Sequence, residues 1–97
     1  MYRIEWEFLP APGREAEFLR AYGADGDWVL LFRRGDGYLG TELLPLPLPG
    51  RAGWYRTVDR WESEAAYAAF RAAQADKYAA LDLACEALTA AERRVSP

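Results

Sequence analysis

Two aromatic-rich segments in the middle of the chain constrain its fold more than any other feature. Residues 37–44 and 54–61 are both rich in residues that favour β-strands, and the prolines and glycines of residues 45–53 separate them. This pattern predicts a β-hairpin. The second segment ends in Trp61 and runs directly into Ser63, a residue type that caps the first turn of helices. The sequence therefore predicts two paired strands followed at once by a helix.

The segment that joins these strands, residues 45–53, cannot itself belong to the sheet. Its three prolines have no backbone N–H to donate to a neighbouring strand. We expect an extended, partly polyproline-like loop. Its apolar Leu46 and Leu48 would be covered by a partner subunit or by the rim of a pocket, or would lie in solvent.

The first third of the chain predicts a strand and then a helix. Residues 2–9 alternate between apolar and mostly charged side chains, as expected of a strand. Pro12 can occupy the first turn of the helix, because its missing N–H does no harm there. Phe18 and Tyr22 would be buried by this helix, and Gly23 would end it.

Residues 28–32 suit a strand by composition, but their context favours a short helix. Asp25 and Asp27 precede them and offer an N-cap. The basic pair and glycine of residues 33–35 are typical of a helix end. We therefore predict a helix here.

Helical patterns fill most of the last third. Ser63 begins one predicted helix, which buries Tyr67 and Phe70, and Asp76 can cap a second. The second helix carries an apolar stripe that we assign to the core: Tyr78, Leu81, Cys85 and Leu88. Residues 93–97 leave room for at most a very short last strand.

The predicted element order gives a fold class. Residues 1–97 are one domain by length, and the order βαββα(β) with right-handed crossovers is the α+β, ferredoxin-like layout, an antiparallel sheet with helices on one face. The strand at residues 54–61 carries bulky side chains on both faces. Glu5 and Glu7 could meet Arg56 and Arg60 as ion pairs on the second face. We therefore expect a homodimer whose sheets pack face to face.

Composition excludes several classes of function. The net charge is −3, which does not favour nucleic-acid binding. There is no apolar run long enough to span a bilayer and no pattern of a signal peptide, so we expect a cytoplasmic protein. The chain has one cysteine, Cys85, and no histidine. No cysteine-based zinc site, no histidine ligand to haem and no histidine-based triad is therefore expected.

The hairpin and the helix after it resemble a known family. Residues 38–44 and 55–63, followed by Tyr67 and Phe70, are similar to the antibiotic biosynthesis monooxygenase (ABM) domain of the dimeric α+β-barrel superfamily. This resemblance implies a ferredoxin-like protomer, a dimer formed through the sheets and a pocket between helices and sheet. The quinol-oxidising members oxygenate a phenol or quinol with O2 and need neither metal nor flavin.

The resemblance also implies site residues. The family's pocket uses a Trp at the end of the third strand, an Asn four residues before it and a Tyr six residues after it. Trp61 and Tyr67 match two of these positions, whereas Thr57 stands at the Asn position. Trp61 and Tyr67 each have a structural alternative. Trp61 could be a core residue, and Tyr67 could make an ordinary contact between helix and sheet.

The residues themselves suggest a proton acceptor. Asp59 shares one face of its strand with Thr57 and Trp61, and burial there would raise its pKa toward neutrality. The alternative is a salt bridge with Arg71 or with a partner's Arg60, and Glu42 is a second candidate carboxylate. We thus predict Asp59 and Tyr67 as catalytic residues. The predicted substrate-binding residues are Tyr55, Thr57, Trp61 and Tyr78.

Three functions remain open at the level of sequence. The first is a cofactor-independent monooxygenase that oxidises a small aromatic or quinol substrate. The second is a non-catalytic ABM-like homodimer that binds an apolar small molecule or acts as a stress-related accessory protein. The third is a structural domain with a filled core. A cavity with converging polar groups would favour the first, an apolar cavity the second, and a filled interior the third.

Overall fold

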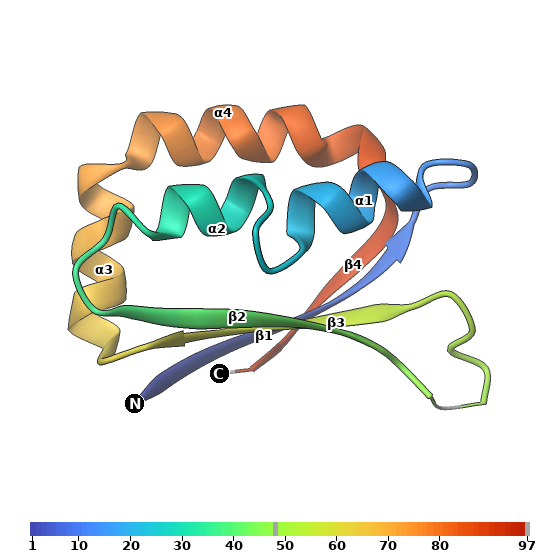
Figure 1. Ribbon diagram of the computed structural model, residues 1–97, viewed down its shortest axis with the longest axis horizontal. Coiled ribbons are helices and arrows are strands. Elements are labelled where there is room, and N and C mark those ends of the chain that lie inside the picture. Colours follow the sequence, from blue (N-terminus) through green and yellow to red (C-terminus); the bar gives the residue numbers. More distant parts are fainter. Residues whose placement is uncertain (48, 97) are drawn as a thin grey trace.

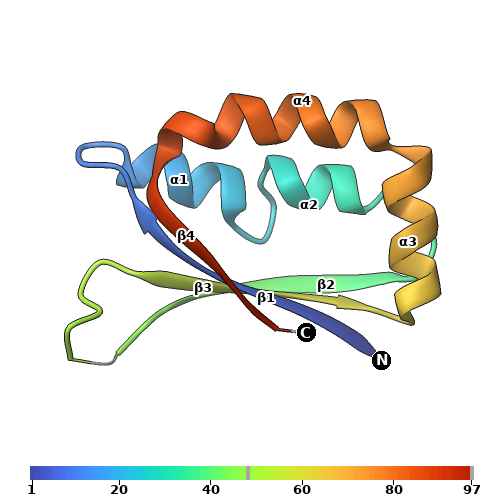
Figure 2. The ribbon, with the colours of Figure 1, turned by 180° about the vertical axis from the view of Figure 1, so that it is seen from behind.

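The computed structural model describes residues 1–47 and 49–96, with the side chain of Ser96 left aside. Its elements in chain order are β1 (Tyr2–Pro10), α1 (Glu15–Tyr22), α2 (Asp27–Phe32), β2 (Tyr38–Pro45), β3 (Tyr55–Trp61), α3 (Glu64–Ala73), α4 (Ala75–Cys85), a 3-10 turn η1 (Glu86–Leu88) and β4 (Thr89–Ser96). Figure 1 shows α1, α2 and α4 above one face of the sheet, with α3 at one end. The reverse view in Figure 2 shows the same layering.

The sheet has four strands in the order β2-β3-β1-β4, and every neighbouring pair is antiparallel. This order confirms the predicted ferredoxin-like α+β fold. The hairpin is confirmed with its register, in which Thr41 stands opposite Asp59. Tyr2 and Tyr38 both stand opposite Trp61, one from each side, so the last residue of β3 lies within the sheet.

The expectation of at most a very short last strand is wrong. β4 has eight residues, Thr89–Ser96, and pairs with β1 along most of its length. Residues 89–92 are compatible with a helix by composition, but the open edge of β1 offers them ladder hydrogen bonds. Propensity is a weak preference that such tertiary pairing overrides. The last residue, Pro97, lies outside the described residues.

Three of the predicted helix signals are confirmed. Residues 28–32 are helical, as predicted, within α2. Ser63 is the N-cap of α3, where its Oγ accepts a hydrogen bond of 3.0 Å from the backbone N–H of Ala66. Gly23 is the residue that ends α1. These three features follow from local chemistry alone.

Three predicted starts are displaced. Pro12 lies in a turn and not in a helix, because α1 begins only at Glu15. α2 begins at Asp27 after Gly26, so an aspartate stands inside the first turn. α4 begins at Ala75 in close succession to α3, which places Asp76 within its first turn. An acidic residue in the first turn still stabilises the helix, because its negative charge interacts favourably with the positive end of the helix dipole.

The core between helices and sheet is aromatic. Its most enclosed large side chains are Trp61 and Phe18, which have no exposed surface. The Trp61 ring is surrounded by those of Phe32, Tyr38, Tyr67 and Phe70, with centroids 4.9 to 6.0 Å away. Such packing fixes the end of β3 against α2 and α3.

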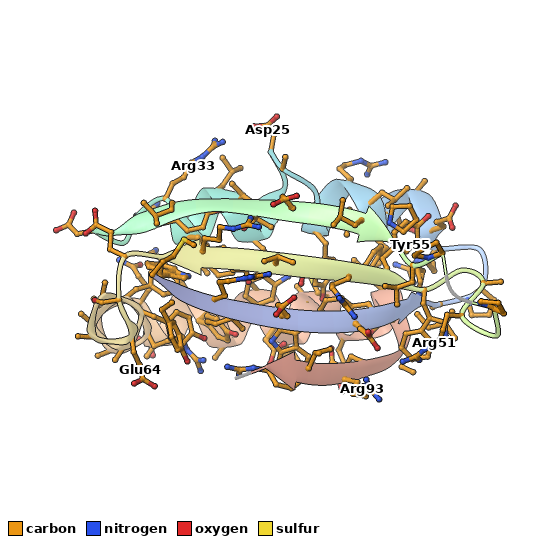
Figure 3. The ribbon with its side chains drawn as sticks, turned by 90° about the horizontal axis from the view of Figure 1, so that it is seen from below. Asp25, Arg33, Arg51, Tyr55, Glu64 and Arg93 are labelled. Atoms are coloured by element: carbon orange, nitrogen blue, oxygen red, sulfur yellow. The ribbon has the colours of Figure 1, made fainter. Side chains whose placement is uncertain are left out.

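The outer face of the sheet is charged. Glu7 is 2% exposed there, and its carboxylate accepts hydrogen bonds from Arg51 at 2.6 Å and Arg56 at 2.8 Å. Arg93 is 3.5 Å from the same group, and Figure 3 shows Arg51 and Arg93 toward one end of this face. The predicted ion pair between Glu7 and Arg56 is therefore confirmed within one chain.

The other predicted partners differ. Arg60 pairs with Glu42 on β2, and Glu5 lies 3.6 Å from Arg3. In the loop between β2 and β3, Leu46 is half-buried and its N–H donates to the Trp54 carbonyl, whereas Leu48 lies outside the described residues. Within the described part of the chain, no helix is long and apolar enough to cross a membrane.

Candidate active site

A cavity of about 270 Å³ lies between the sheet and the helices. Each helix α1 to α4 and each strand contributes to its wall. The aromatic part of the wall is formed by Trp6, Phe8, Tyr22, Trp28, Phe32 and Tyr78. The polar part is formed by Thr41, Thr57, Asp59, Arg71, Asp82 and Glu92. This combination of aromatic surface and a few polar groups is typical of sites for small organic ligands.

Asp59 is the polar group with the most unusual environment. It lies in the middle of β3, is 8% exposed and faces the helices. The hydroxyl of Thr41, directly opposite on β2, donates to its Oδ1 at 2.7 Å. Burial raises the pKa of Asp59 to about 6, against the opposing effects of the Thr41 hydrogen bond and the positive charge of Arg94. Asp59 can therefore both accept and release a proton near neutral pH.

Arg71 supplies a cation to the same cavity. Its Nη1 donates to the hydroxyl oxygen of Tyr67 at 2.9 Å, and its guanidinium lies 3.8 Å from the centre of the Tyr78 ring. Burial raises the pKa of Tyr78, so this hydroxyl stays protonated at neutral pH. Arg71 is thus held between two tyrosines at the edge of the cavity.

The structure brings three of the predicted site residues together. Thr57, Asp59 and Tyr78 all line the cavity, and Thr57 is buried at its floor on β3. Within the described part of the chain Asp59 does not pair with Arg71, and the alternative pair with a partner's Arg60 stays a prediction. The hydrogen-bond partner of Asp59 is Thr41, and Arg71 bonds to Tyr67 instead.

The other three predicted residues do not line this cavity. Trp61 is fully enclosed among rings behind it. Tyr67 contacts the cavity indirectly, through its hydrogen bond with Arg71. Tyr55 lies at the opposite end of β3, where its hydroxyl donates to Glu15 at 3.1 Å.

Sequence reasoning missed several wall residues. Thr41 could not be found from the hairpin alone, because a regular register with Trp61 opposite Tyr38 would place Gly40 opposite Asp59. Only the register shift between Tyr38 and Gly40 brings Thr41 to that position. Arg71 was considered only as an ion-pair partner. Glu92 gave no signal, because it belongs to β4, a strand that was not expected to reach so far.

A second hollow of about 400 Å³ lies between α4 and β4. It shares Tyr22, Asp82 and Glu92 with the first cavity, but it contains neither Asp59 nor the Trp6 and Trp28 rings. Across residues 1–47 and 49–96, no group of three or more acidic or cysteine side chains is arranged to hold a metal ion. The first cavity is therefore the candidate active site, and proton transfer is the chemistry that its residues can perform.

Known structures share this fold. No family model and no curated protein matches the sequence. PA3566 from Pseudomonas aeruginosa superposes with a TM-score of 0.62 and 16% identity, over 98% of this chain and 91% of that one. SO0527 from Shewanella oneidensis superposes with a TM-score of 0.61 and 18% identity, over 96% of this chain and 84% of that one.

A third solved structure carries a functional name. It is a variant of SnoaB, a cofactor-independent oxygenase from Streptomyces nogalater, with a TM-score of 0.61 and 17% identity over 98% of this chain and 90% of that chain. These likenesses extend over nearly the whole chain. At such identities they establish a shared fold, and the function must be argued from the site.

Proposed function

We propose that this protein is a cofactor-independent monooxygenase that oxidises a small phenol or quinol with O2 in the cavity beside Asp59. The observation that carries the proposal is a buried carboxylate with a pKa of about 6 on the wall of an aromatic cavity. SnoaB, which shares the fold, is a cofactor-independent oxygenase. That fold can therefore support such chemistry.

The reaction begins with a proton transfer. The Asp59 carboxylate accepts the hydroxyl proton of the phenol, and the resulting anion transfers one electron to O2. The two radicals combine to form a carbon–oxygen bond on the ring, and Asp59 returns the proton to give a hydroperoxide. Loss of water from this intermediate leaves a quinone. One oxygen atom enters the product and the other becomes water, so phenol and O2 supply all atoms and electrons.

The other wall residues have supporting roles in this reaction. In this proposal the rings of Trp28, Phe32 and Tyr78 hold a flat substrate, and the hydroxyl of Thr57, which lines the cavity, binds a substrate oxygen. The guanidinium of Arg71 stabilises the anion formed after proton transfer. Tyr67 orients Arg71 through their hydrogen bond. Trp61 supports the site from behind.

We also propose that the protein is a homodimer that buries the outer face of the sheet. This face alternates acidic and basic side chains, and the exposed apolar Leu44 and Val95 lie at its two outer strands. Alternating charges can complement a second copy turned through a two-fold axis. Sedimentation at micromolar concentration should show about twice the chain mass of 11.0 kDa, and a single species at the chain mass would contradict the dimer.

One observation favours a second function, a binding protein without catalysis. The hydroxyl of Tyr67, predicted to contact the substrate, is engaged by Arg71 and does not line the cavity. A cavity of this kind could retain a small aromatic molecule without turnover. The protein would then act as a binding or accessory protein without catalysing a reaction.

The deciding experiment is oxygen consumption with a panel of quinols and polycyclic phenols, in chelator-treated buffer without added flavin. We expect uptake proportional to protein concentration, and its loss in Asp59→Asn. Asp25→Asn is the matched control, because Asp25 is an exposed carboxylate that pairs with Arg33 away from the cavity. Quenching of tryptophan fluorescence by the same compounds measures binding. Binding without uptake would support the second function and contradict the first.

A further inference from the structure

A chain of two hydrogen bonds ends on the candidate base. The Tyr38 and Thr41 hydroxyl oxygens are 2.6 Å apart, and the Thr41 Oγ1 is 2.7 Å from Oδ1 of Asp59. Tyr38 is half-buried and lies outside the cavity wall, whereas Thr41 and Asp59 belong to it. The three residues therefore link the packed interior behind the site to the reactive carboxylate.

The direction of this chain follows from the number of protons. A hydroxyl has one hydrogen, and the Thr41 hydrogen is donated to Asp59. Between Tyr38 and Thr41, the donor must then be Tyr38. The chain is thus oriented, with the Tyr38 O–H donating to Thr41 and the Thr41 O–H donating to the carboxylate.

An irregularity of β2 makes the chain possible. In a regular strand, residues three positions apart face opposite sides of the sheet. The register shifts between Tyr38 and Gly40, where Gly40 has a φ of +146°, so that one additional residue is accommodated. Tyr38 and Thr41 therefore share the inner face. The Tyr38 ring is held there against Phe32 and Trp61, with centroids 5.5 and 5.2 Å away.

The two oxygens of Asp59 are consequently not equivalent. Oδ1 accepts the Thr41 hydrogen bond. Asp59 lines the cavity, so a ligand there can approach the second oxygen, Oδ2. We propose that Tyr38 is a positioning residue that acts through Thr41 to hold Oδ1 and leave Oδ2 of Asp59 as the proton acceptor for the ligand. This inference rests on the proposed function, because it specifies which atom of the base reacts.

Other charged and titratable groups face Asp59 and must be held constant in a test. Arg94 on β4 acts on it electrostatically. Those that share its cavity are Tyr22 of α1, Arg71 of α3, Tyr78 and Asp82 of α4, and Glu92 of β4. None of them is changed in the variants below, so their contribution to the Asp59 titration is common to all.

The test is a titration of the Asp59 carboxyl carbon by ¹³C NMR in the full chain without substrate. A hydrogen bond to a carboxylate favours its ionised form, so Thr41→Val should raise the titration midpoint of Asp59 by about one pH unit. Tyr38→Phe removes only the polarisation of the Thr41 hydroxyl and should raise the midpoint by a few tenths of a unit, on the order of 10–30% of the Thr41 effect. Tyr2→Phe is the control, because Tyr2 is on β1 and outside the cavity wall, and it should leave the midpoint unchanged.

The double variant gives the sharpest outcome. Because Tyr38 acts through Thr41, Tyr38→Phe should produce no further change in the Thr41→Val background. An equal change in both backgrounds, or no change in Thr41→Val alone, would overturn the proposal. Amide spectra check that each variant is folded. The titration needs no turnover, so an absence of oxygen uptake refutes the enzyme proposal without deciding this one. Where uptake occurs, the acidic limb of its pH profile should move with the midpoint.

Discussion

Gly35 lies directly against the ring of Trp61. A Cβ atom at position 35 would stand 2.8 Å from Cζ3 of that ring and 2.9 Å from the Phe70 ring. Contacts this short force the neighbours to move, and Trp61 has no exposed surface into which it could turn. The turn after α2 and the end of β3 are thus packed so closely that only glycine fits between them.

Gly35→Ala should therefore be destabilising. Overpacking of this kind costs about 1–3 kcal/mol, which chemical denaturation would measure as a lower midpoint with an unchanged slope. Repeating the substitution in a Trp61→Phe background removes the two Trp61 ring atoms that the new methyl group meets and leaves the contact with Phe70. A smaller cost there is expected. The same cost in both backgrounds would show that the contact with Trp61 is not its cause.

Trp61 should contribute to stability more than to chemistry. Trp61→Ala removes a fully enclosed side chain and should lower the free energy of unfolding by about 3–5 kcal/mol. Among the described residues the Trp61 Nε1 has no hydrogen-bond partner, so Trp61→Phe loses volume without breaking a hydrogen bond there and should cost less. Thermal unfolding of both variants tests whether Trp61→Ala loses more stability than Trp61→Phe. A stable Trp61→Ala protein that fails to bind aromatic compounds would instead assign Trp61 to the binding surface.

Asp59 should make stability fall as pH rises. Its pKa is about 6 in the folded protein against an ordinary value of 3.8, so the folded state binds its proton more tightly than the unfolded state does. This contribution is fully present below pH 3.8 and is lost as pH rises through about 6. The difference corresponds to about 3 kcal/mol.

Asp59→Asn provides the comparison, because it removes the titration and keeps the shape. Relative to wild type, the variant should gain stability by up to about 3 kcal/mol between about pH 4 and about pH 8. Urea denaturation of both proteins across this range measures the effect. A constant difference would mean that Asp59 titrates near its ordinary value.

Glu7 should act in the opposite direction. Its hydrogen bond with Arg56, together with the charges of Arg51 and Arg93, lowers the Glu7 pKa below 4.5 despite burial. Its contribution is therefore present above the unfolded pKa and is lost as pH falls. Glu7→Gln replaces the charged acceptor of the arginine hydrogen bonds with a neutral one. It should lower the free energy of unfolding by about 1.5–3 kcal/mol at neutral pH, and this loss should shrink in acid.

The matched control is Glu42→Gln. Glu42 pairs with one arginine, Arg60, and its side chain is 49% exposed, so its loss should cost less than about 1 kcal/mol. Equal effects of the two substitutions at neutral pH would contradict a special role for the buried carboxylate.

Several parts of the fold and of the site could be predicted because their signals are local. The hairpin follows from two β-prone segments around a proline-rich loop, and Ser63 caps α3 through its own hydroxyl. The alternation along β3 also placed Thr57 and Asp59 on one face, toward the helices.

Other parts needed the tertiary structure. The irregularity at Gly40 turns Tyr38 and Thr41 to one side, and its position depends on pairing with β3. Tyr67 and Arg71 lie four residues apart on one face of α3, so their contact is local. That Arg71 bonds to Tyr67 and not to Asp59, however, depends on how α3 sits against the sheet.

The sequence by itself thus determined the element order, the hairpin and the face on which Asp59 lies, since these depend on neighbours a few positions apart. The tertiary structure decided the length of β4, the enclosure of Trp61 and the polar groups around the cavity. These depend on surfaces brought together from distant parts of the chain: β4 extends because the edge of β1 is free to pair with it, and Asp59 has a raised pKa because helices and sheet together remove it from water.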